Sequence, residues 1–266
     1  MKKTVIMIIC AVMMFCSCTK MQEMPASSGY PPIFYSLEPQ TTFFGTFRPI
    51  KSIFEKNARM LGMIKYDDED ILCEYVVPSG TEEECDAVLA DIKTLSDDIC
   101  KDCTTDSERL YAIAEWVSVN IYYDRDAADT SVTNETVSLK NVFENRRTTC
   151  AGYSNAVSAL CGAQGIVCVN LRGGSSSTGY TRAQLEKAPK NHEWNGAVID
   201  GEWVFCDTTW ASQNRFQNGA FFKNEILTDY YFSFPFSEMS IEHRIDIADF
   251  RDFYGISDRN SQQNPE

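Results

Sequence analysis

Two runs of alternating apolar residues, 192–199 and 202–207, are separated only by the dipeptide Asp200-Gly201. An Asp-Gly pair between such runs is the strongest short signal for a two-residue β-hairpin. With the turn at these two residues, Asp207 lies opposite Trp194. His192 is two residues from Trp194, so its side chain leaves the same face of the sheet. We therefore predict that His192 and Asp207 are diagonal neighbours, which a register slip of one residue would separate.

A cysteine stands at the expected start of a helix upstream of this hairpin. Thr148 and Thr149 can cap a helix, and helix-compatible sequence follows Cys150. The unpaired N–H groups and the positive dipole end of a first turn favour a thiolate, which is the nucleophilic form of cysteine. Cys150 is therefore a candidate nucleophile, and a small core residue is the alternative interpretation.

A cysteine nucleophile needs a histidine to take its proton and a carboxylate to orient that histidine. His192 and Asp207 fit these roles, although His192 could instead be a hydrogen-bonded structural residue. The only other histidine, His243, lies in Glu-His-Arg-Ile and has no predicted partner of this kind.

Helices precede the predicted sheet along the chain. Thr81 with Glu84, and Thr105 with Glu108, form capping-box patterns that open helices to about residues 100 and 121. We expect strands near 43–47 and 71–77, a helix near 51–60, and a polar loop over 124–138. Residues 165–171 are expected to form a strand that ends in a loop at Gly173 and Gly174. This order predicts an α+β fold.

The N-terminus has the pattern of an export signal. A basic start is followed by an apolar run at residues 5–15, too short to span a bilayer, and then by Ser17-Cys18. This resembles a bacterial lipoprotein signal, with residues 1–17 removed and Cys18 lipidated. Residues 18–32 then form a tether to a protein anchored in the cell envelope. An ordinary secretory signal, giving a secreted protein, is the alternative.

Composition excludes several classes of function. The net charge of −14 argues against a nucleic-acid partner, which needs a basic patch. With two histidines and a single Cys100-x-x-Cys103 pair, we expect no metal and no cofactor. The disulfide pattern stays unassigned. Three further cysteines are interpreted as small core residues: Cys161, Cys168 and Cys206.

Three separated motifs carry a family resemblance. They are Cys150-Ala-Gly-Tyr153, His192-x-Trp194-Asn195, and a third from Ile199 to Trp210 that contains Asp207. Together they resemble the core of the transglutaminase-like superfamily, closest to its cytokinesis and kyphoscoliosis-type branch. The resemblance implies a papain-like core, with Cys150 on a helix packed on an antiparallel sheet that carries His192 and Asp207. It covers about residues 105–250, between an N-terminal region of unknown role (33–104) and a tail (251–266).

The resemblance also implies a reaction. Cys150 would attack an amide carbonyl of a protein or peptide, including a peptidoglycan stem peptide, to form a thioester. Water or an amine would resolve the thioester, and we favour water. The candidate side-chain donors to the oxyanion are Tyr122, Tyr123 and Asn141.

Several roles stay open at this point. Trp194 either shields the histidine or belongs to the core, whereas Tyr153 and Trp210 are interpreted as packing residues. The aromatic residues over 221–236 either cover the sheet or line a groove. A non-catalytic binding or scaffolding protein is the alternative function. A third is an adhesin or assembly factor whose function lies in residues 19–100.

Overall fold

The structure is a computed structural model that describes residues 40–42, 45–47, 49–61, 81–176 and 182–246. The predicted signal, the lipidated Cys18, the tether, the strand near 71–77 and the C-terminal tail lie outside the described residues. Among the described helices, none has the length and hydrophobicity needed to cross a membrane.

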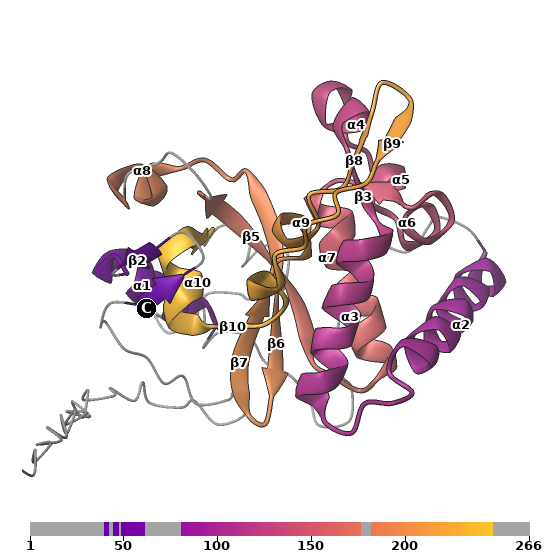
Figure 1. The fold of residues 1–266 in the computed structure, drawn as a ribbon, viewed down its shortest axis with the longest axis horizontal. Coiled ribbons are helices and arrows are strands. Elements are labelled where there is room, and N and C mark those ends of the chain that lie inside the picture. Colours follow the sequence, from indigo (N-terminus) through magenta and orange to yellow (C-terminus); the bar gives the residue numbers. More distant parts are fainter. Residues whose placement is uncertain (1–39, 43–44, 48, 62–80, 177–181, 247–266) are drawn as a thin grey trace, which may run out of the picture.

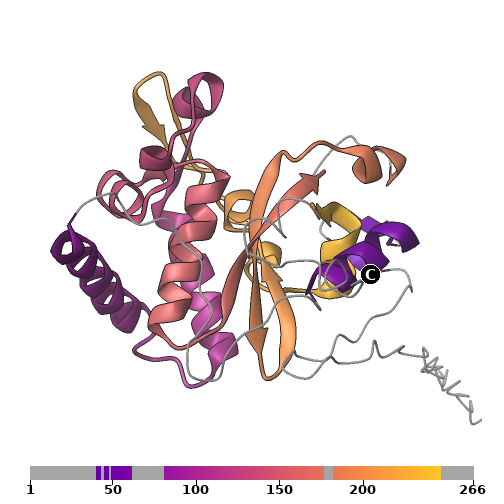
Figure 2. The same ribbon diagram turned by 180° about the vertical axis from the view of Figure 1, so that it is seen from behind.

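A five-stranded antiparallel sheet forms the centre of the fold, in the order β10-β7-β6-β5-β11. Figure 1 shows α2, α3 and α7 on one side of this sheet and α1 with α10 on the other, and Figure 2 shows the same arrangement from behind. The predicted α+β class is confirmed. The strands are β5 (Cys168–Ser175), β6 (His192–Ile199), β7 (Glu202–Cys206), β10 (Phe234–Pro235) and β11 (His243–Ile245).

The two helices predicted from capping boxes begin where the sequence predicts. Thr81 and Thr105 each form a complete capping box, with Glu84 and Glu108 respectively. The expected helix near residues 51–60 is also present, and its Phe54 and Leu61 join the same core as α2, α3 and α7. The helices around this sheet are α1 (Lys51–Leu61), α2 (Glu82–Ile99), α3 (Asp106–Asn120), α7 (Cys150–Ala163), α8 (Arg182–Lys187), α9 (Thr208–Ser212) and α10 (Phe236–Glu242), with a 3-10 turn at Asp229–Phe232.

A second sheet has four strands in the order β4-β3-β8-β9. It lies on the side of α9 that faces away from the five-stranded sheet (Figure 1). Strand β3 pairs in parallel with both β4 and β8, while β8 and β9 form a hairpin. The strands are β3 (Tyr122–Asp124), β4 (Arg147–Thr148), β8 (Arg215–Gln217) and β9 (Ala220–Phe222). A separate hairpin joins β1 (Gln40–Thr42) to β2 (Gly45–Phe47).

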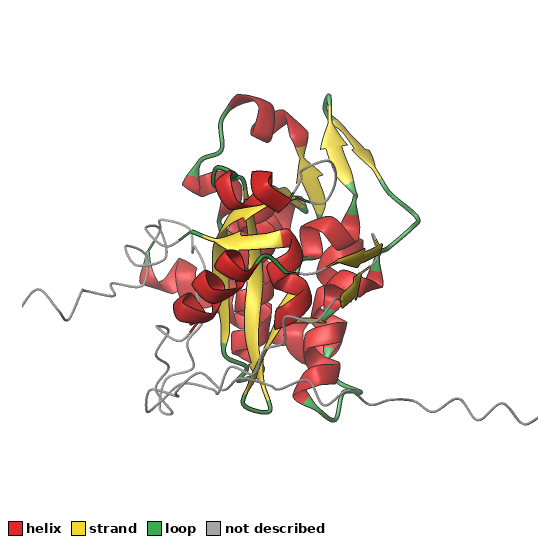
Figure 3. Cartoon of the chain, turned by 90° about the vertical axis from the view of Figure 1, so that its left-hand side faces the viewer, coloured by secondary structure: helices red, strands yellow, loops and turns green. Residues whose placement is uncertain are grey.

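The polar loop expected over 124–138 is wrong, because the segment contains two short helices. Asp124 accepts a hydrogen bond from the Ala127 N–H, and Thr133 accepts one from the Thr136 N–H, so each caps a first turn. The helices of this region, seen beside the second sheet in Figure 3, are α4 (Arg125–Thr130), α5 (Asn134–Val137) and α6 (Leu139–Asn145).

The Asp200-Gly201 hairpin is confirmed in the predicted register. Asn195 pairs with Cys206, and Asp200 and Gly201 have φ of 53° and 81°, as a two-residue hairpin of this type requires. The loop predicted at Gly173 and Gly174 is wrong, because β5 continues through both to Ser175. A Cβ at Gly173 would strike the carbonyl of Arg244, so the missing side chain is what lets β11 pair here.

Candidate active site

Asp207 is fully buried immediately after β7, where it caps α9. Its Oδ1 accepts the N–H of Trp210 at 3.1 Å, and its backbone N–H donates to the carbonyl of Tyr231 at 2.9 Å. Its Oδ2 faces Nε2 of His192 at 2.6 Å. Burial opposes the charged form, yet the two histidines that face the carboxyl hold its pKa well below the usual range. Asp207 is therefore a fixed carboxylate.

His192 is the first residue of β6 and is largely buried. Burial alone would lower its pKa, but the adjacent Asp207 carboxylate outweighs burial and raises the pKa to about 10. Cys150 lies beside the same ring and also raises its pKa, which favours the protonated form. Because Nε2 faces Asp207, Nδ1 is the ring nitrogen left to exchange a proton with Cys150. The predicted contact between His192 and Asp207 is present.

Cys150 is the first residue of α7 and is partly exposed. Thr149 stands at the cap position in extended backbone, but its hydroxyl makes no capping hydrogen bond. The prediction that threonine side chains cap this helix is therefore wrong for Thr149, and Thr148 donates instead to the carbonyl of Thr136. The N–H groups of the first turn keep no side-chain cap, and such groups can bind a developing oxyanion.

Buried polar side chains fix α7 against the sheet. Asn170 on β5 donates to Asn155 at 2.8 Å, and Ser158 on α7 donates to Asn170 at 2.7 Å. Asn195 on β6 donates to Ser158 and Asn170, while Asn155 donates to the carbonyl of Val137. A slip of α7 along the sheet would leave these buried amides unpaired, which is costly. The network therefore fixes the position of Cys150 relative to His192.

Two indole rings lie nearly parallel to the His192 ring. Trp210 stacks on it with centroids 5.0 Å apart and an interplanar angle of 11°, and Trp194 lies 6.1 Å away at 20°. An aromatic face stabilises an adjacent cation. The packing role predicted for Trp210 is confirmed, but the residue on which it packs is the site histidine. Trp194 is fully buried, so it belongs both to the core and to the wall of the site.

The structure corrects the sequence interpretation of His243, which does have a carboxylate partner. Its Nε2 lies 3.1 Å from Oδ2 of Asp207, so two imidazoles share one oxygen. Burial lowers the pKa of His243, so its ring stays neutral at pH 7 and donates Nε2–H to the carboxylate. No sequence pattern could reveal this contact, because β11 is two strands from β6 and reaches Asp207 only through its side chain.

His192, Asp207 and His243 offer three ligand atoms within 4.8 Å of one another. In a tetrahedral zinc site, ligands about 2.0 Å from the ion lie about 3.3 Å apart. The separation of 2.6 Å between Nε2 of His192 and Oδ2 of Asp207 is too short for that arrangement and fits a charge-assisted hydrogen bond. The geometry of these residues does not fit a metal ion.

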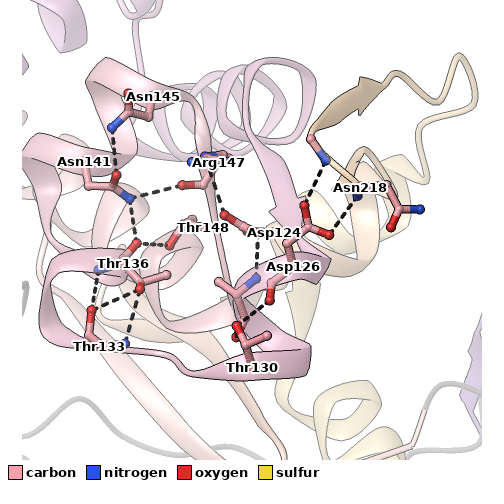
Figure 4. Close-up of polar contacts among 12 residues, drawn as sticks. Asp124, Asp126, Thr130, Thr133, Thr136, Asn141, Asn145, Arg147, Thr148 and Asn218 are labelled. Atoms are coloured by element: carbon pink, nitrogen blue, oxygen red, sulfur yellow. Dashed lines mark hydrogen bonds and ion pairs between the residues drawn. The ribbon is translucent and has the colours of Figure 1, made fainter.

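The three candidate oxyanion donors lie in different surroundings. Asn141 donates to the carbonyls of Thr136 and Arg147, at 2.8 and 3.3 Å, so its amide hydrogens are already used (Figure 4). Tyr122 packs edge-on against Phe221. Tyr123 lines the cleft beside His192, and burial and the charge of Cys150 raise the pKa of its hydroxyl. Tyr123 is therefore protonated and able to donate.

A cleft of about 560 Å³ opens at His192. This volume suits a short peptide segment. Its lining comes from α9 and the residues after it (Thr209, Trp210, Gln213, Asn214), from β3, α4 and β8 (Tyr123, Arg125, Arg215), and from the ends of β5 and β6 (Ser175, Ser176, Asn191, His192). The cleft therefore lies between the two sheets, with α9 joining them.

The other residues to which the sequence analysis gave a role lie mostly in the core. Tyr153 is buried and donates to the carbonyl of Ile121 at 2.7 Å, as a packing role predicts. Cys161, Cys168 and Cys206 are buried, as predicted. Of the aromatic run, Phe221 and Phe222 are exposed, so they do not cover the sheet, whereas four later members are buried: Tyr231, Phe232, Phe234 and Phe236.

The central part of the chain is similar in sequence to known proteins. Residues 93–208 match the family model of the transglutaminase-like superfamily. Kyphoscoliosis peptidase of Mus musculus is 29% identical over 125 residues, which cover 47% of this chain and 19% of that protein. The Homo sapiens protein is 30% identical over 118 residues, covering 44% and 18%. The chain thus spans about a fifth of the length of these relatives.

Among solved structures, the crystal structure of a TGase is similar at a TM-score of 0.40 and 18% identity. The aligned part covers 53% of this chain and 37% of that one.

Proposed function

Because the chain belongs to the transglutaminase-like superfamily through residues 93–208, we propose that it is a cysteine acyltransferase or hydrolase acting on amide bonds. Cys150 is the nucleophile, His192 the general base and then acid, and Asp207 the residue that orients His192. The observation that carries the proposal is the contact of one buried imidazole with both the Cys150 thiol and the Asp207 carboxylate.

The reaction follows the usual course of such a triad. Because the pKa of His192 is raised, Nδ1 already holds the proton taken from the thiol, and the Cys150 thiolate attacks the amide carbonyl carbon. The imidazolium then protonates the leaving amine as the C–N bond breaks, which leaves a thioester. A water molecule, deprotonated by the same nitrogen, attacks the thioester and releases the acid and the free thiol. An amine in place of water would give transamidation.

Two donors are proposed for the oxyanion. One is the N–H of Cys150, in the uncapped first turn of α7. The other is the hydroxyl of Tyr123, which lines the cleft beside His192. Asn141 is a poorer donor because its amide already bonds Thr136 and Arg147.

The proposed substrate is a protein or peptide, including a peptidoglycan stem peptide. The cleft supports this because its volume of about 560 Å³ suits a short peptide segment and its lining is mostly polar. We also propose export, with a lipid anchor at Cys18, on the strength of the short apolar run before Ser17-Cys18. Hydrolysis is favoured over cross-linking because water is abundant in the cell envelope.

Alkylation of Cys150 by iodoacetamide tests the nucleophile without knowledge of the substrate. Wild type, Cys150→Ala and His192→Ala are treated from about pH 4 to 9, and modified peptides are identified by mass spectrometry because other thiols are present. We expect Cys150 to react readily at neutral pH in wild type and far more slowly in His192→Ala. Equal rates in both proteins would leave a binding or scaffolding role as the better interpretation.

Incorporation of a labelled amine into a glutamine-containing protein then separates transamidation from hydrolysis. A product that contains the amine supports transamidation, whereas release of ammonia or a new terminus without amine incorporation supports hydrolysis.

A further inference from the structure

The charges that line the cleft are opposite in sign to the charge of the whole chain. The chain carries a net charge of −14. The cleft is nevertheless lined by two arginines, Arg125 and Arg215, and by no carboxylate among the described residues. A cleft of one sign concentrates ligands of the opposite charge.

Arg215 lies on β8 of the second sheet, and Arg125 is the first residue of α4, directly after the neighbouring strand β3. Tyr123 on β3 pairs in parallel with Arg215 on β8, and Arg125 follows Tyr123 by two residues. The guanidinium carbon of Arg125 lies 5.0 Å from the Tyr123 ring centroid, and that of Arg215 lies 5.1 Å from the Phe222 centroid. Stacking on a ring orders the plane of a guanidinium and leaves its N–H edge free for a planar anion.

Two nearby acidic groups are bound elsewhere. Asp126 accepts hydrogen bonds from the N–H groups of Asn218 and Gly219, at 2.8 and 3.0 Å, and Asp124 pairs with Arg147 at 3.6 Å (Figure 4). Within the described part of the chain, neither Arg125 nor Arg215 forms an ion pair. Both are exposed, so their charge is available to a ligand in the cleft.

We infer that Arg125 and Arg215 form a carboxylate subsite, so that the substrate carries an acidic group close to the amide that Cys150 attacks. This inference rests on the proposed function, because it names the substrate class of the same cleft. A guanidinium fork binds a carboxylate through two parallel hydrogen bonds, which gives orientation as well as charge. The carboxylate is either an acidic side chain or a free C-terminus.

A pair of reagents that differ only in charge tests the subsite. Iodoacetate carries a carboxylate where iodoacetamide has an amide, and both alkylate the Cys150 sulfur. In wild type and in Arg125→Gln, Arg215→Gln and the double variant, the ratio of the two rates at Cys150 is measured by mass spectrometry. We expect the ratio of the iodoacetate rate to the iodoacetamide rate at Cys150 to fall about fivefold in the double variant at low salt.

Arg109→Gln is the matched control. It makes the same charge change on α3, where Arg109 pairs with Asp106 on the surface away from the cleft. The rate ratio should stay at the wild-type value in this variant. Arg215→Lys should keep part of the preference for iodoacetate, because it keeps the charge but loses the fork. Circular dichroism checks that each variant is folded.

The two sources of the carboxylate are separated with peptides. Ala-Ala-Gln-Glu-Ala and Ala-Ala-Gln-Gln-Ala, each with a free or amidated C-terminus, are compared by kcat/KM and by quenching of tryptophan fluorescence, since Trp210 lines the cleft. Preference for the glutamate peptide indicates a side chain, and preference for the free terminus indicates a C-terminus. Either preference should disappear in the double variant.

The outcomes separate the two proposals. A rate ratio in the double variant equal to that of wild type and Arg109→Gln would overturn the carboxylate subsite, even if Cys150 is highly reactive. A Cys150 that reacts sluggishly with both reagents would overturn the proposed function. In that case tryptophan quenching by the glutamate peptide, present in wild type and lost in the double variant, would still support the subsite.

Discussion

Replacing Asp207 by asparagine changes a single atom at the point on which the proposed site depends. The carboxylate uses Oδ1 to accept the Trp210 N–H and Oδ2 to face Nε2 of His192. An asparagine that keeps the first hydrogen bond through its oxygen points its NH₂ group at Nε2. Nε2 must then accept a hydrogen bond, so the ring proton of neutral His192 moves to Nδ1. Nδ1 is the nitrogen left to exchange a proton with Cys150, and once it carries the ring proton it can no longer take the thiol proton.

The size of the effect follows from the protonation of His192. Its pKa of about 10 lies well above the ordinary value of 6.5. That difference corresponds to about 5 kcal/mol of preference for the imidazolium. Without the carboxylate, burial is the main remaining influence and lowers the pKa. With the tautomer also wrong, we expect Asp207→Asn to lose about 10³- to 10⁴-fold in turnover, the scale seen when a triad loses this carboxylate.

The assay is iodoacetamide alkylation of Cys150 near pH 6, followed by mass spectrometry, with kcat/KM on a cleaved peptide once one is found. Asp106→Asn serves as control, because it neutralises an exposed surface carboxylate outside the cleft. An Asp207→Asn protein that is folded and reacts within about threefold of wild type would refute the assignment of Asp207 as the orienting residue.

Three further predictions follow from the same contacts. His243→Phe keeps the aromatic packing but removes one donor to a buried carboxylate, so the free energy of unfolding in urea should fall by about 1–3 kcal/mol, with a smaller loss of Cys150 reactivity than in Asp207→Asn. In wild type, the stability from the raised pKa of His192 is complete below pH 6.5 and is lost as pH rises through about 10. The stability from the lowered pKa of Asp207 is present above its usual 3.8 and is lost as pH falls. The difference in stability between wild type and Asp207→Asn should therefore be largest from about pH 4 to 6.5 and decline toward pH 10. Urea unfolding of both proteins across this pH range measures the difference, and a difference that does not change with pH would contradict the prediction. Gly173→Ala should destabilise the protein by about 1–3 kcal/mol, because the added methyl group meets the carbonyl of Arg244 and pushes β11 away; an unchanged unfolding midpoint would contradict this close approach.

Local rules are enough to predict much of the site. The Asp200-Gly201 turn fixes the register of its own hairpin, and register fixes which residues share a face. The contact of His192 with Asp207 therefore follows from the order of the residues along the chain. Capping boxes at Thr81 and Thr105 likewise start helices through contacts only three residues apart.

Contacts between distant segments cannot be predicted in this way. The glycines at 173 and 174 favour a loop locally, yet β11 arrives about 70 residues later and turns them into a strand, because only glycine leaves room for the Arg244 carbonyl. The amide network of Asn155, Asn170 and Asn195 likewise depends on three elements meeting in one core.

The sequence by itself determined the hairpin, the two capped helices, the α+β class and three residues that would carry the proposed chemistry. Only the tertiary structure brought His243 to the Asp207 carboxylate, stacked Trp210 on His192 and placed both Arg125 and Arg215 in the lining of one cleft. The physical reason is the separation along the chain between the residues that make each contact. Turns, caps and strand register are decided by contacts a few residues apart, whereas the second histidine and the arginine pair depend on how the two sheets and α9 pack together.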